Sequence, residues 1–226
     1  MAIAQAKFGR VDRVALRDKI AHIIQEAILS GQYTPGDRIV EMTVAEQMNV
    51  GQNTIREALQ VLEHQFLVTK TPHLGTFVTK LSDEEVSQIY RVRLELEPLA
   101  AELAAERLDE KSYQSLEKIA DRMATCVRLG DYKQYVRSDF DLHEAIWELS
   151  GNRFLVKALQ TITPPLFAYI LIRNFHIAGN LQMAEELNSH AAMVRILSGK
   201  DAHTARQYSR ELMQRSWEQT VRNLQT

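Results

Sequence analysis

Apolar residues recur at helical spacing in three stretches of the first third of the chain. In residues 14–29 they lie three and four positions apart and the run stops at residues 30–31, which predicts a core-facing helix. A short helix is predicted over about residues 43–48, and Asn49 can adopt the left-handed backbone that a tight turn between helices requires. A third helix is predicted after Gly51, and its buried stripe comprises Ile55, Ala58, Leu59 and Leu62.

Two short segments with strand-forming side chains follow these helices. They cover residues 67–70 and 75–78, and a turn sequence containing Pro72 separates them. Three helices followed by a hairpin predict a winged helix-turn-helix. The polar face of the third helix carries Gln52, Asn53, Arg56 and Gln60, and amides and arginine are the side chains that read base edges in DNA. The alternative is a solvated polar face without a ligand.

After residue 81 helical periodicity continues to the end of the chain. Ser82 and Glu85 form a capping-box pattern that predicts the start of a helix. We therefore expect a DNA-binding domain over residues 1–80 and a helical domain for effector binding and dimerisation over residues 81–226. Its helices are predicted at 83–107, 110–129, 132–149, 152–160, 163–178, 181–198 and 201–224. The predicted fold class is mainly α, an N-terminal winged helix-turn-helix plus a C-terminal all-helical bundle.

Composition is that of an ordinary globular protein, with 226 residues of which 45% are hydrophobic and 25% charged. No run of 18 apolar residues and no signal-peptide core occur, so we expect a cytoplasmic protein without a membrane partner. Charge alone does not favour DNA binding, because residues 1–80 contain nine Lys/Arg against eight Asp/Glu, and residues 81–226 contain eighteen against twenty-one. The single cysteine, Cys126, is expected to be a small apolar residue on a helix.

Several short segments of the first third occur in a characteristic order. They are Pro35-Gly36-Asp37-Arg38-Ile39, Val44-Ala45-Glu46, Ile55-Arg56-Glu57-Ala58-Leu59, Leu62-Glu63 and Leu74-Gly75-Thr76-Phe77-Val78. In this order they resemble the winged helix-turn-helix of GntR-family regulators, over about residues 14–79. The resemblance implies that double-stranded operator DNA is the partner, and that the contacting residues are Arg38, Gln52, Asn53, Thr54, Arg56 and Gly75.

The chain departs from this family pattern at two positions that usually carry a cation. Gly51-Gln52-Asn53-Thr54 stands where the family often has Ser-Arg-Thr-Pro, and Leu74 stands where Arg often precedes the wing glycine. These departures bear on the operator sequence more than on DNA binding itself.

Asp139 and His143 are four residues apart, so their side chains project from one face of the predicted helix. Such a pair has metal-ligand geometry, but taken alone it is more often an ordinary surface or hydrogen-bonded pair. Together with Arg93-x3-Glu97, Leu149-Ser150-Gly151-Asn152, His190 and Gly199-x-Asp201, the pair resembles the ligand-binding domain of the FadR-type branch of the same family, over about residues 84–220. Many members bind a divalent metal through an Asp, a His one turn later and two further His. The resemblance implies zinc, nickel or manganese on Asp139, His143 and His190.

The fourth ligand of that set falls at Leu212, which cannot coordinate a metal. His203 lies nine residues earlier, about half a helical turn out of phase, whereas Tyr208 and Ser209 lie nearer the Leu212 face. Two alternatives remain open. Three protein ligands bind a metal together with water or an effector oxygen, or the polar cluster binds the effector directly.

Arg93 and Arg173 are the expected cations for an anionic effector, because arginine pairs bidentately with carboxylates; a surface salt bridge is the alternative for each. Five aromatic residues are spaced like core or interface residues, namely Trp147, Phe167, Tyr169, Phe175 and Trp217. The whole sequence indicates a homodimeric, effector-responsive transcription regulator that is not an enzyme. Its rivals are a metal-dependent helical enzyme and a helical adaptor that has lost DNA binding.

Overall fold

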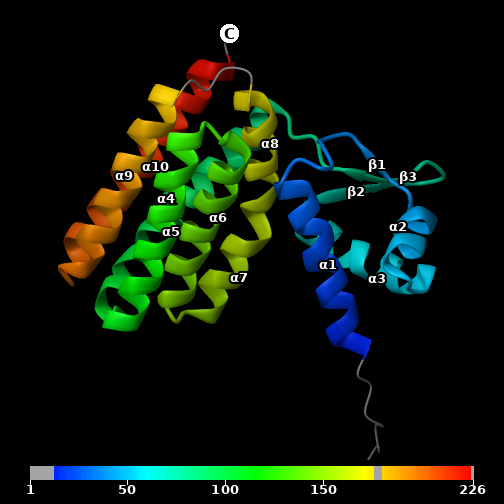
Figure 1. The fold of residues 1–226 in the computed structure, drawn as a ribbon, viewed down its shortest axis with the longest axis horizontal. Helices are drawn as coiled ribbons and strands as arrows, with labels where there is room; N and C mark the ends of the chain where they lie inside the picture. The colour runs from blue at the N-terminus through cyan, green and yellow to red at the C-terminus, as the bar shows by residue number, and fades with distance from the viewer. Residues whose placement is uncertain (1–12, 176–179, 225–226) are drawn as a thin grey trace, which may run out of the picture.

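A computed structural model describes residues 13–175 and 180–224, with a winged unit beside a helical bundle (Figure 1). The winged unit contains α1 (Arg13–Leu29), β1 (Arg38–Ile39), α2 (Glu41–Met48), α3 (Gln52–His64), β2 (Val68–Thr71) and β3 (Gly75–Val78). The bundle contains α4 (Asp83–Arg107), α5 (Glu110–Leu129), α6 (Tyr132–Leu149), α7 (Arg153–Ile162), α8 (Pro164–Phe175), α9 (Asn180–Ser198) and α10 (Ala202–Leu224). This architecture confirms the predicted fold class.

The turn between α2 and α3 has the predicted geometry. Asn49 adopts φ 50° and ψ 48°, in the left-handed region, and Gly51 is the N-cap of α3. The buried side of α3 contains Ile55, Ala58, Leu59 and Leu62, as expected from the sequence. Helix α2 begins at Glu41, two residues before the predicted start, because the extended backbone of Val40 serves as its N-cap.

The sheet has three strands in the order β1-β3-β2, all antiparallel, where the sequence predicted only a hairpin. Strand β1 contains two residues, too few for an alternating pattern to be visible. It pairs Arg38 with Phe77 and Ile39 with Thr76, and Ile39 is buried. Strand β1 therefore holds Arg38 beside the β2–β3 hairpin, which forms the wing.

The bundle begins with the predicted capping box. The Ser82 hydroxyl accepts a hydrogen bond from the Glu85 backbone N–H, and the Glu85 carboxylate accepts one from the Ser82 backbone N–H. The predicted boundary between residues 80 and 81 lies in the segment that joins β3 to this cap. Helix α8 is described as far as Phe175, and its predicted end at residue 178 falls within residues 176–179, which lie outside the described part of the chain. Cys126 is buried on α5, as predicted.

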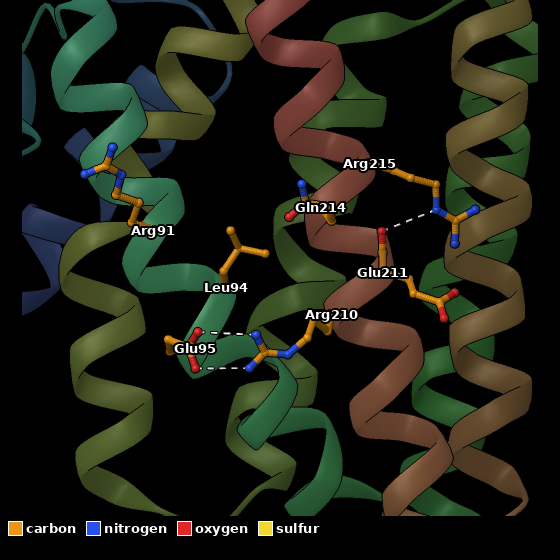
Figure 2. Close-up of a pocket in the computed structure, with 7 residues that line it drawn as sticks. All are labelled: Arg91, Leu94, Glu95, Arg210, Glu211, Gln214 and Arg215. Carbon is orange, nitrogen blue, oxygen red and sulfur yellow. Dashed lines mark hydrogen bonds and ion pairs between the residues drawn. The ribbon is translucent and has the colours of Figure 1, made fainter.

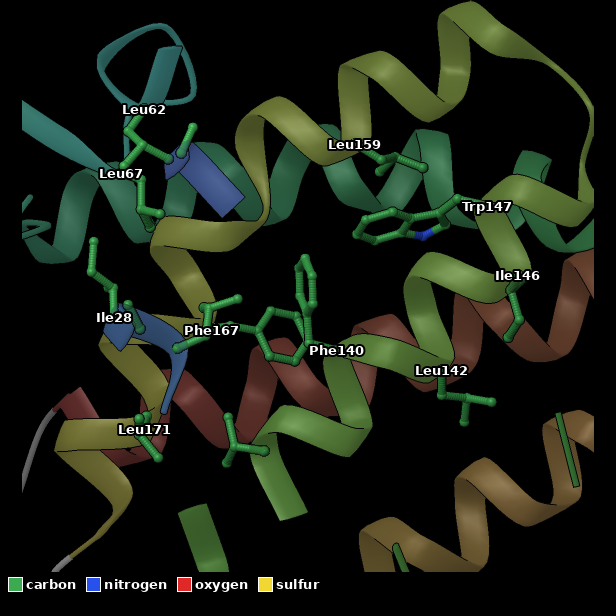
Figure 3. Close-up of a cluster of buried hydrophobic side chains, with 14 of the residues drawn as sticks. Ile28, Leu62, Leu67, Phe140, Leu142, Ile146, Trp147, Leu159, Phe167 and Leu171 are labelled. Carbon is green, nitrogen blue, oxygen red and sulfur yellow. The ribbon is translucent and has the colours of Figure 1, made fainter. Parts of the chain in front are cut away.

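The winged unit and the bundle share one continuous apolar core. Figure 3 shows Ile28, Leu62 and Leu67 of the winged unit beside Phe167 and Leu171 of α8, and all five belong to one buried cluster. The core therefore crosses the junction between the two units and packs α1 and α3 against the bundle helices.

Residues 153–171 are long and apolar enough, by length and composition, to cross a membrane, the one such stretch among the described residues. They form two helices, α7 and α8, since α7 ends at Ile162 and α8 starts at Pro164. Half of the stretch is buried inside the protein, where Leu159 and Phe167 belong to the common core.

Candidate nucleic-acid interface and metal centre

The N-terminal turn of α3 presents the polar residues that the sequence assigned to DNA. Gln52, Asn53 and Arg56 are exposed, and Thr54 is half-buried. They lie opposite the buried stripe of α3, so packing inside the winged unit leaves them available to a ligand.

Glu41 at the start of α2 holds two of these side chains together. Its Oε2 accepts a hydrogen bond from Arg56 Nη2 at 2.8 Å and another from Gln52 Nε2 at 3.1 Å. Asn53 Oδ1 accepts a third bond from Arg56 Nη1 at 3.3 Å. The sequence pattern contained no signal for Glu41, because this residue lies on another helix and is brought to α3 by the turn.

Gly75 and Arg38 lie against each other at the base of the wing. Gly75 has a φ of +117°, and a Cβ built on it would be 3.0 Å from Arg38 Nε. The absence of a side chain therefore makes room for the guanidinium, while the positive φ independently favours glycine. Leu74, which replaces a common arginine, is 60% exposed.

Asp139, His143 and His190 converge in the bundle, although the first two lie on α6 and the third on α9. One ligand atom from each lies within 4.8 Å of the others. Asp139 Oδ1 is 2.9 Å from His190 Nε2 and 3.6 Å from His143 Nε2. Both histidines are buried.

Each histidine has its Nδ1 occupied by an acceptor on the side away from Asp139. His190 Nδ1 lies 2.8 Å from the Glu186 carbonyl oxygen, and His143 Nδ1 lies 3.2 Å from Glu97 Oε2. If each Nδ1–H donates to its acceptor, a neutral ring carries its free lone pair on Nε2, which faces Asp139. Asp139 Oδ1 is a buried oxygen on which the Nε2 atoms of both rings converge. These features fit a cation at this point.

The charges within the cluster depend on one another. Burial alone would raise the pKa of Asp139, yet the neighbouring His190 lowers this pKa below its ordinary value. Burial opposes protonation of His190, but the Asp139 carboxylate raises the pKa of His190 to about 9. Without a cation the two groups therefore form an ion pair, and a metal held by these residues would take the place of the His190 proton.

Glu97 on α4 joins the cluster to Arg93. Its Oε1 accepts hydrogen bonds from Arg93 Nε at 3.0 Å and Nη2 at 2.7 Å, and its Oε2 accepts one from Trp147 Nε1 at 2.7 Å. Burial would raise the pKa of Glu97, but the charges of His143 and Arg93 lower it to about 2. The carboxylate stays ionised. The indole donor of Trp147 had no signal in the sequence, which indicated only a core or interface residue.

A cavity of about 420 Å³ opens beside this cluster and is lined by residues that include Arg93, Asp139, His143, His190 and Leu212. Arg93 is buried, so its ion pair with Glu97 is not the surface salt bridge that the sequence left open. Its hydrogen bonds to Glu97 use Nε and Nη2, so the Glu97 carboxylate does not engage Nη1. The Arg173 side chain lies outside the described residues.

The candidates for the missing fourth ligand occupy different places. Ser209 is buried and lines a small adjoining cavity with His143, His190 and Leu212. The Tyr208 hydroxyl donates a hydrogen bond to the Ser189 carbonyl oxygen, so this hydroxyl is already engaged. His203 is exposed and its Nε2 lies 2.8 Å from Gln207 Nε2, apart from the cluster. Leu212, at the expected fourth position, is apolar, and the hydroxyl-bearing Ser209 lines the same small cavity.

A winged helix-turn-helix joined to a helical bundle with a polar cavity defines a ligand-responsive DNA-binding regulator. Residues 16–78 match the family described as bacterial regulatory proteins, gntR family, and residues 88–215 match the FCD domain. The FCD match alone covers more than half of the chain. The chain therefore belongs to the gntR family of transcription regulators that carry an FCD domain, a family of DNA-binding proteins rather than enzymes.

Relatives of similar length share both parts of the chain. It is 28% identical over 186 residues to the uncharacterized HTH-type transcriptional regulator YdhC of Bacillus subtilis, covering 82% of each chain. It is 23% identical over 220 residues to the gluconate operon transcriptional repressor of Bacillus licheniformis, covering 95% of this chain and 86% of that protein. The solved structure of Escherichia coli McbR/YncC has a TM-score of 0.81 at 20% identity, covering 92% and 98%, and shows the same fold.

Proposed function

We propose that this regulator is a homodimer that controls a metabolic operon in response to a small carboxylate bound together with a divalent metal in the bundle. The observation that carries the proposal is the convergence of Asp139, His143, His190 and Arg93 on one cavity. Residues 81–226 would bind effector and dimerise, and residues 1–80 would bind operator DNA. A gluconate operon repressor among the relatives is consistent with a carboxylate effector.

The metal would be held by Asp139, His143 and His190, with zinc, nickel or manganese as candidates. Such an ion supplies a positive charge to which an effector oxygen can coordinate. Because Leu212 offers no ligand atom, the remaining coordination positions are left to water or to the effector. Glu97 and the Glu186 carbonyl would hold the two rings so that Nε2 faces the ion.

Arg93 would bind the effector carboxylate through Nη1, since Glu97 already occupies its Nε and Nη2. Arg173 remains a second candidate for the same anion. The competing proposal is that the polar cluster binds the effector without a metal. The 2.9 Å contact between His190 and Asp139 favours this alternative, because it is short enough for a direct ion pair.

The DNA interface would combine the exposed turn of α3 with the base of the wing. Its residues are Arg38, Gln52, Asn53, Thr54, Arg56 and Gly75. Amides would read bases and Arg56 a base or phosphate, while two copies would contact the two halves of a palindromic operator. A protein with this partner acts in the cytoplasm, and we propose no membrane partner.

The proposal is tested by binding DNA from upstream of the neighbouring operon, with and without gluconate as a probe carboxylate. Purified without chelator, the wild-type protein should contain exchangeable divalent metal, and chelation should abolish the response to gluconate while sparing basal DNA binding. Metal-free protein with an unchanged response would support direct effector binding. Failure to bind any operator fragment would refute the assigned DNA interface.

A further inference from the structure

Tyr135 on α6 carries a buried hydroxyl without a hydrogen-bond partner. The residue is 1% exposed, and among the described residues no donor or acceptor pairs with its hydroxyl oxygen. A buried hydroxyl ordinarily forms at least one hydrogen bond, because leaving it unpaired costs free energy. Tyr90 of α4 shows the ordinary case, since its buried hydroxyl lies 3.0 Å from Ser216 Oγ and 3.0 Å from Thr220 Oγ1. The Tyr135 hydroxyl therefore calls for an explanation.

The surface groove between α4 and α10 contains polar side chains in the opposite situation. There Arg210 donates two hydrogen bonds to the Glu95 carboxylate, and Arg215 Nε donates to the Glu211 carbonyl oxygen (Figure 2). These four residues are also exposed, so water can satisfy the donors and acceptors that the protein does not. None of the four therefore calls for a ligand, whereas Tyr135 has neither a partner nor access to solvent.

Tyr135 lies on the same face of α6 as two of the candidate metal ligands. Asp139 and His143 follow it by about one and two helical turns. Glu186, likewise, precedes His190 by one turn on α9. Burial, together with the carboxylates of Asp139 and Glu186, raises the pKa of Tyr135 above its ordinary value. The group therefore stays a protonated hydroxyl that can donate a hydrogen bond, and it is not a tyrosinate ligand for a metal.

The Asp139 carboxylate offers an acceptor to this hydroxyl. Its contacts with the two histidine rings both use Oδ1, so Oδ2 is the oxygen that a further donor can approach. On α5 a tyrosine and a carboxylate at the same spacing are joined, since a hydrogen bond to Glu117 raises the pKa of Tyr113. Aspartate is one methylene shorter than glutamate, so the Asp139 carboxylate has to turn toward Tyr135 before the bond can form.

A metal at this site would allow the carboxylate to turn. In the structure Asp139 Oδ1 lies 2.9 Å from His190 Nε2, the separation of a direct ion pair. An ion held between the two groups would part them and would replace the proton that now joins them. The Asp139 carboxylate would then be free to present Oδ2 to the hydroxyl of Tyr135.

We propose that Tyr135 is a positioning residue for the metal site, whose hydroxyl donates to Asp139 Oδ2 in the metal-bound protein and has no partner in the metal-free protein. The inference rests on the proposed function, because it presupposes the metal. Tyr135 would support Asp139 as Glu97 supports His143, whose Nδ1 lies 3.2 Å from Glu97 Oε2. The free energy that the unpaired hydroxyl costs would be recovered only on metal binding, which strengthens that binding.

The test is the Tyr135→Phe variant of the full chain, stripped of metal with a chelator and then titrated with Co²⁺. Removal of an unpaired hydroxyl should raise the melting temperature of the metal-free protein by about 2–4 °C. The affinity for Co²⁺ should instead fall about 10-fold, and the visible spectrum of the bound ion should change, because Asp139 loses its fixed orientation. A role of the hydroxyl in the fold alone would produce neither the higher melting temperature nor the altered spectrum.

The matched control is Tyr132→Phe, which removes the same atom from the same helix. Tyr132 is 8% exposed, and its hydroxyl donates to the Ile170 carbonyl oxygen at 3.4 Å. Because this hydroxyl already has a partner, Tyr132→Phe should lower the melting temperature of the metal-free protein. Its affinity for Co²⁺ and the spectrum of the bound ion should match those of the wild type.

The outcomes separate this inference from the proposed function. If wild type and Tyr135→Phe bind Co²⁺ with equal affinity and the same spectrum, the role of Tyr135 is overturned while the metal site stands. A lower melting temperature of metal-free Tyr135→Phe would show that the hydroxyl has a partner without metal, and this result also overturns the inference. A wild-type protein that binds no Co²⁺ would overturn both the inference and the metal in the proposed function.

Discussion

Arg137 of α6 and Glu26 of α1 form a two-bonded ion pair across the junction between the bundle and the winged unit. Arg137 Nε donates to Glu26 Oε2 at 2.7 Å, and Arg137 Nη2 donates to Glu26 Oε1 at 2.8 Å. Arg137 precedes Asp139 by two residues on the same helix. A displacement of α6 by an occupant of the cavity would therefore be transmitted to α1, which packs on α3 in the common core.

We expect Glu26→Gln to weaken the coupling between cavity and DNA. Operator affinity without effector should be retained, while the change in affinity caused by gluconate and metal should shrink, because coupling between the sites depends on contacts that join them. DNA binding with and without both ligands measures this effect. Glu102→Gln is the control, since Glu102 pairs with Arg206 inside the bundle, away from the network that Arg137 forms with Glu26 and Asp141. A full response in Glu26→Gln would exclude this ion pair from the coupling.

Arg56→Ala should abolish specific operator binding and leave dimerisation and helicity intact. The arginine side chain is 44% exposed, and among the described residues its hydrogen-bond partners are Glu41 and Asn53. Loss of a base contact should weaken operator binding by about 1–3 kcal/mol. Loss of a phosphate contact should instead reduce the slope of the log binding constant against log salt concentration by about one. Salt-dependent fluorescence anisotropy distinguishes the two. Glu57→Ala on the same exposed side of α3 is the control, and unchanged operator affinity in Arg56→Ala would remove this residue from the interface.

His143→Ala should eliminate both metal binding and the effector response. It should spare DNA binding, because the proposed DNA-contacting helix α3 belongs to the winged unit and His143 to the bundle. Leu212→His should strengthen metal binding, since Leu212 lines one cavity with all three candidate ligands and a second with His143 and His190. Elemental analysis and thermal shift with zinc, nickel or manganese provide the measurement. The metal proposal fails if neither wild type nor Leu212→His acquires an ion.

Glu97→Gln should lower metal affinity about 10–100-fold, although Glu97 need not touch the ion. The amide cannot accept all the bonds that the carboxylate receives from Arg93, His143 and Trp147, so His143 loses its fixed orientation. Titration with Co²⁺, followed by its visible spectrum, reports both affinity and coordination geometry. Glu95→Gln, on the exposed side of the same helix, should leave that spectrum unchanged. An unaltered Co²⁺ spectrum in Glu97→Gln would mean that Glu97 does not orient His143 toward the metal.

The features that the sequence determined alone depend on neighbours a few residues away. The left-handed turn at Asn49, the Ser82–Glu85 capping box and the buried stripe of α3 follow from local backbone preference and from helical periodicity. The pairing of Asp139 with His143 was visible for the same reason, because one helical turn separates them. The family resemblance added His190, whose distance from the other two no periodicity could supply.

Tertiary structure alone decided which distant side chains meet. Glu41 contacts Arg56, Glu97 contacts Trp147 and His143, and Arg137 contacts Glu26 only because separate helices pack at particular angles and rotations. Strand β1 is equally invisible in the sequence, since two residues carry no periodicity and pair only when β3 is already in place. Ion pairs and hydrogen bonds act over a few ångströms in defined directions, so their partners exist only after packing has brought remote segments together.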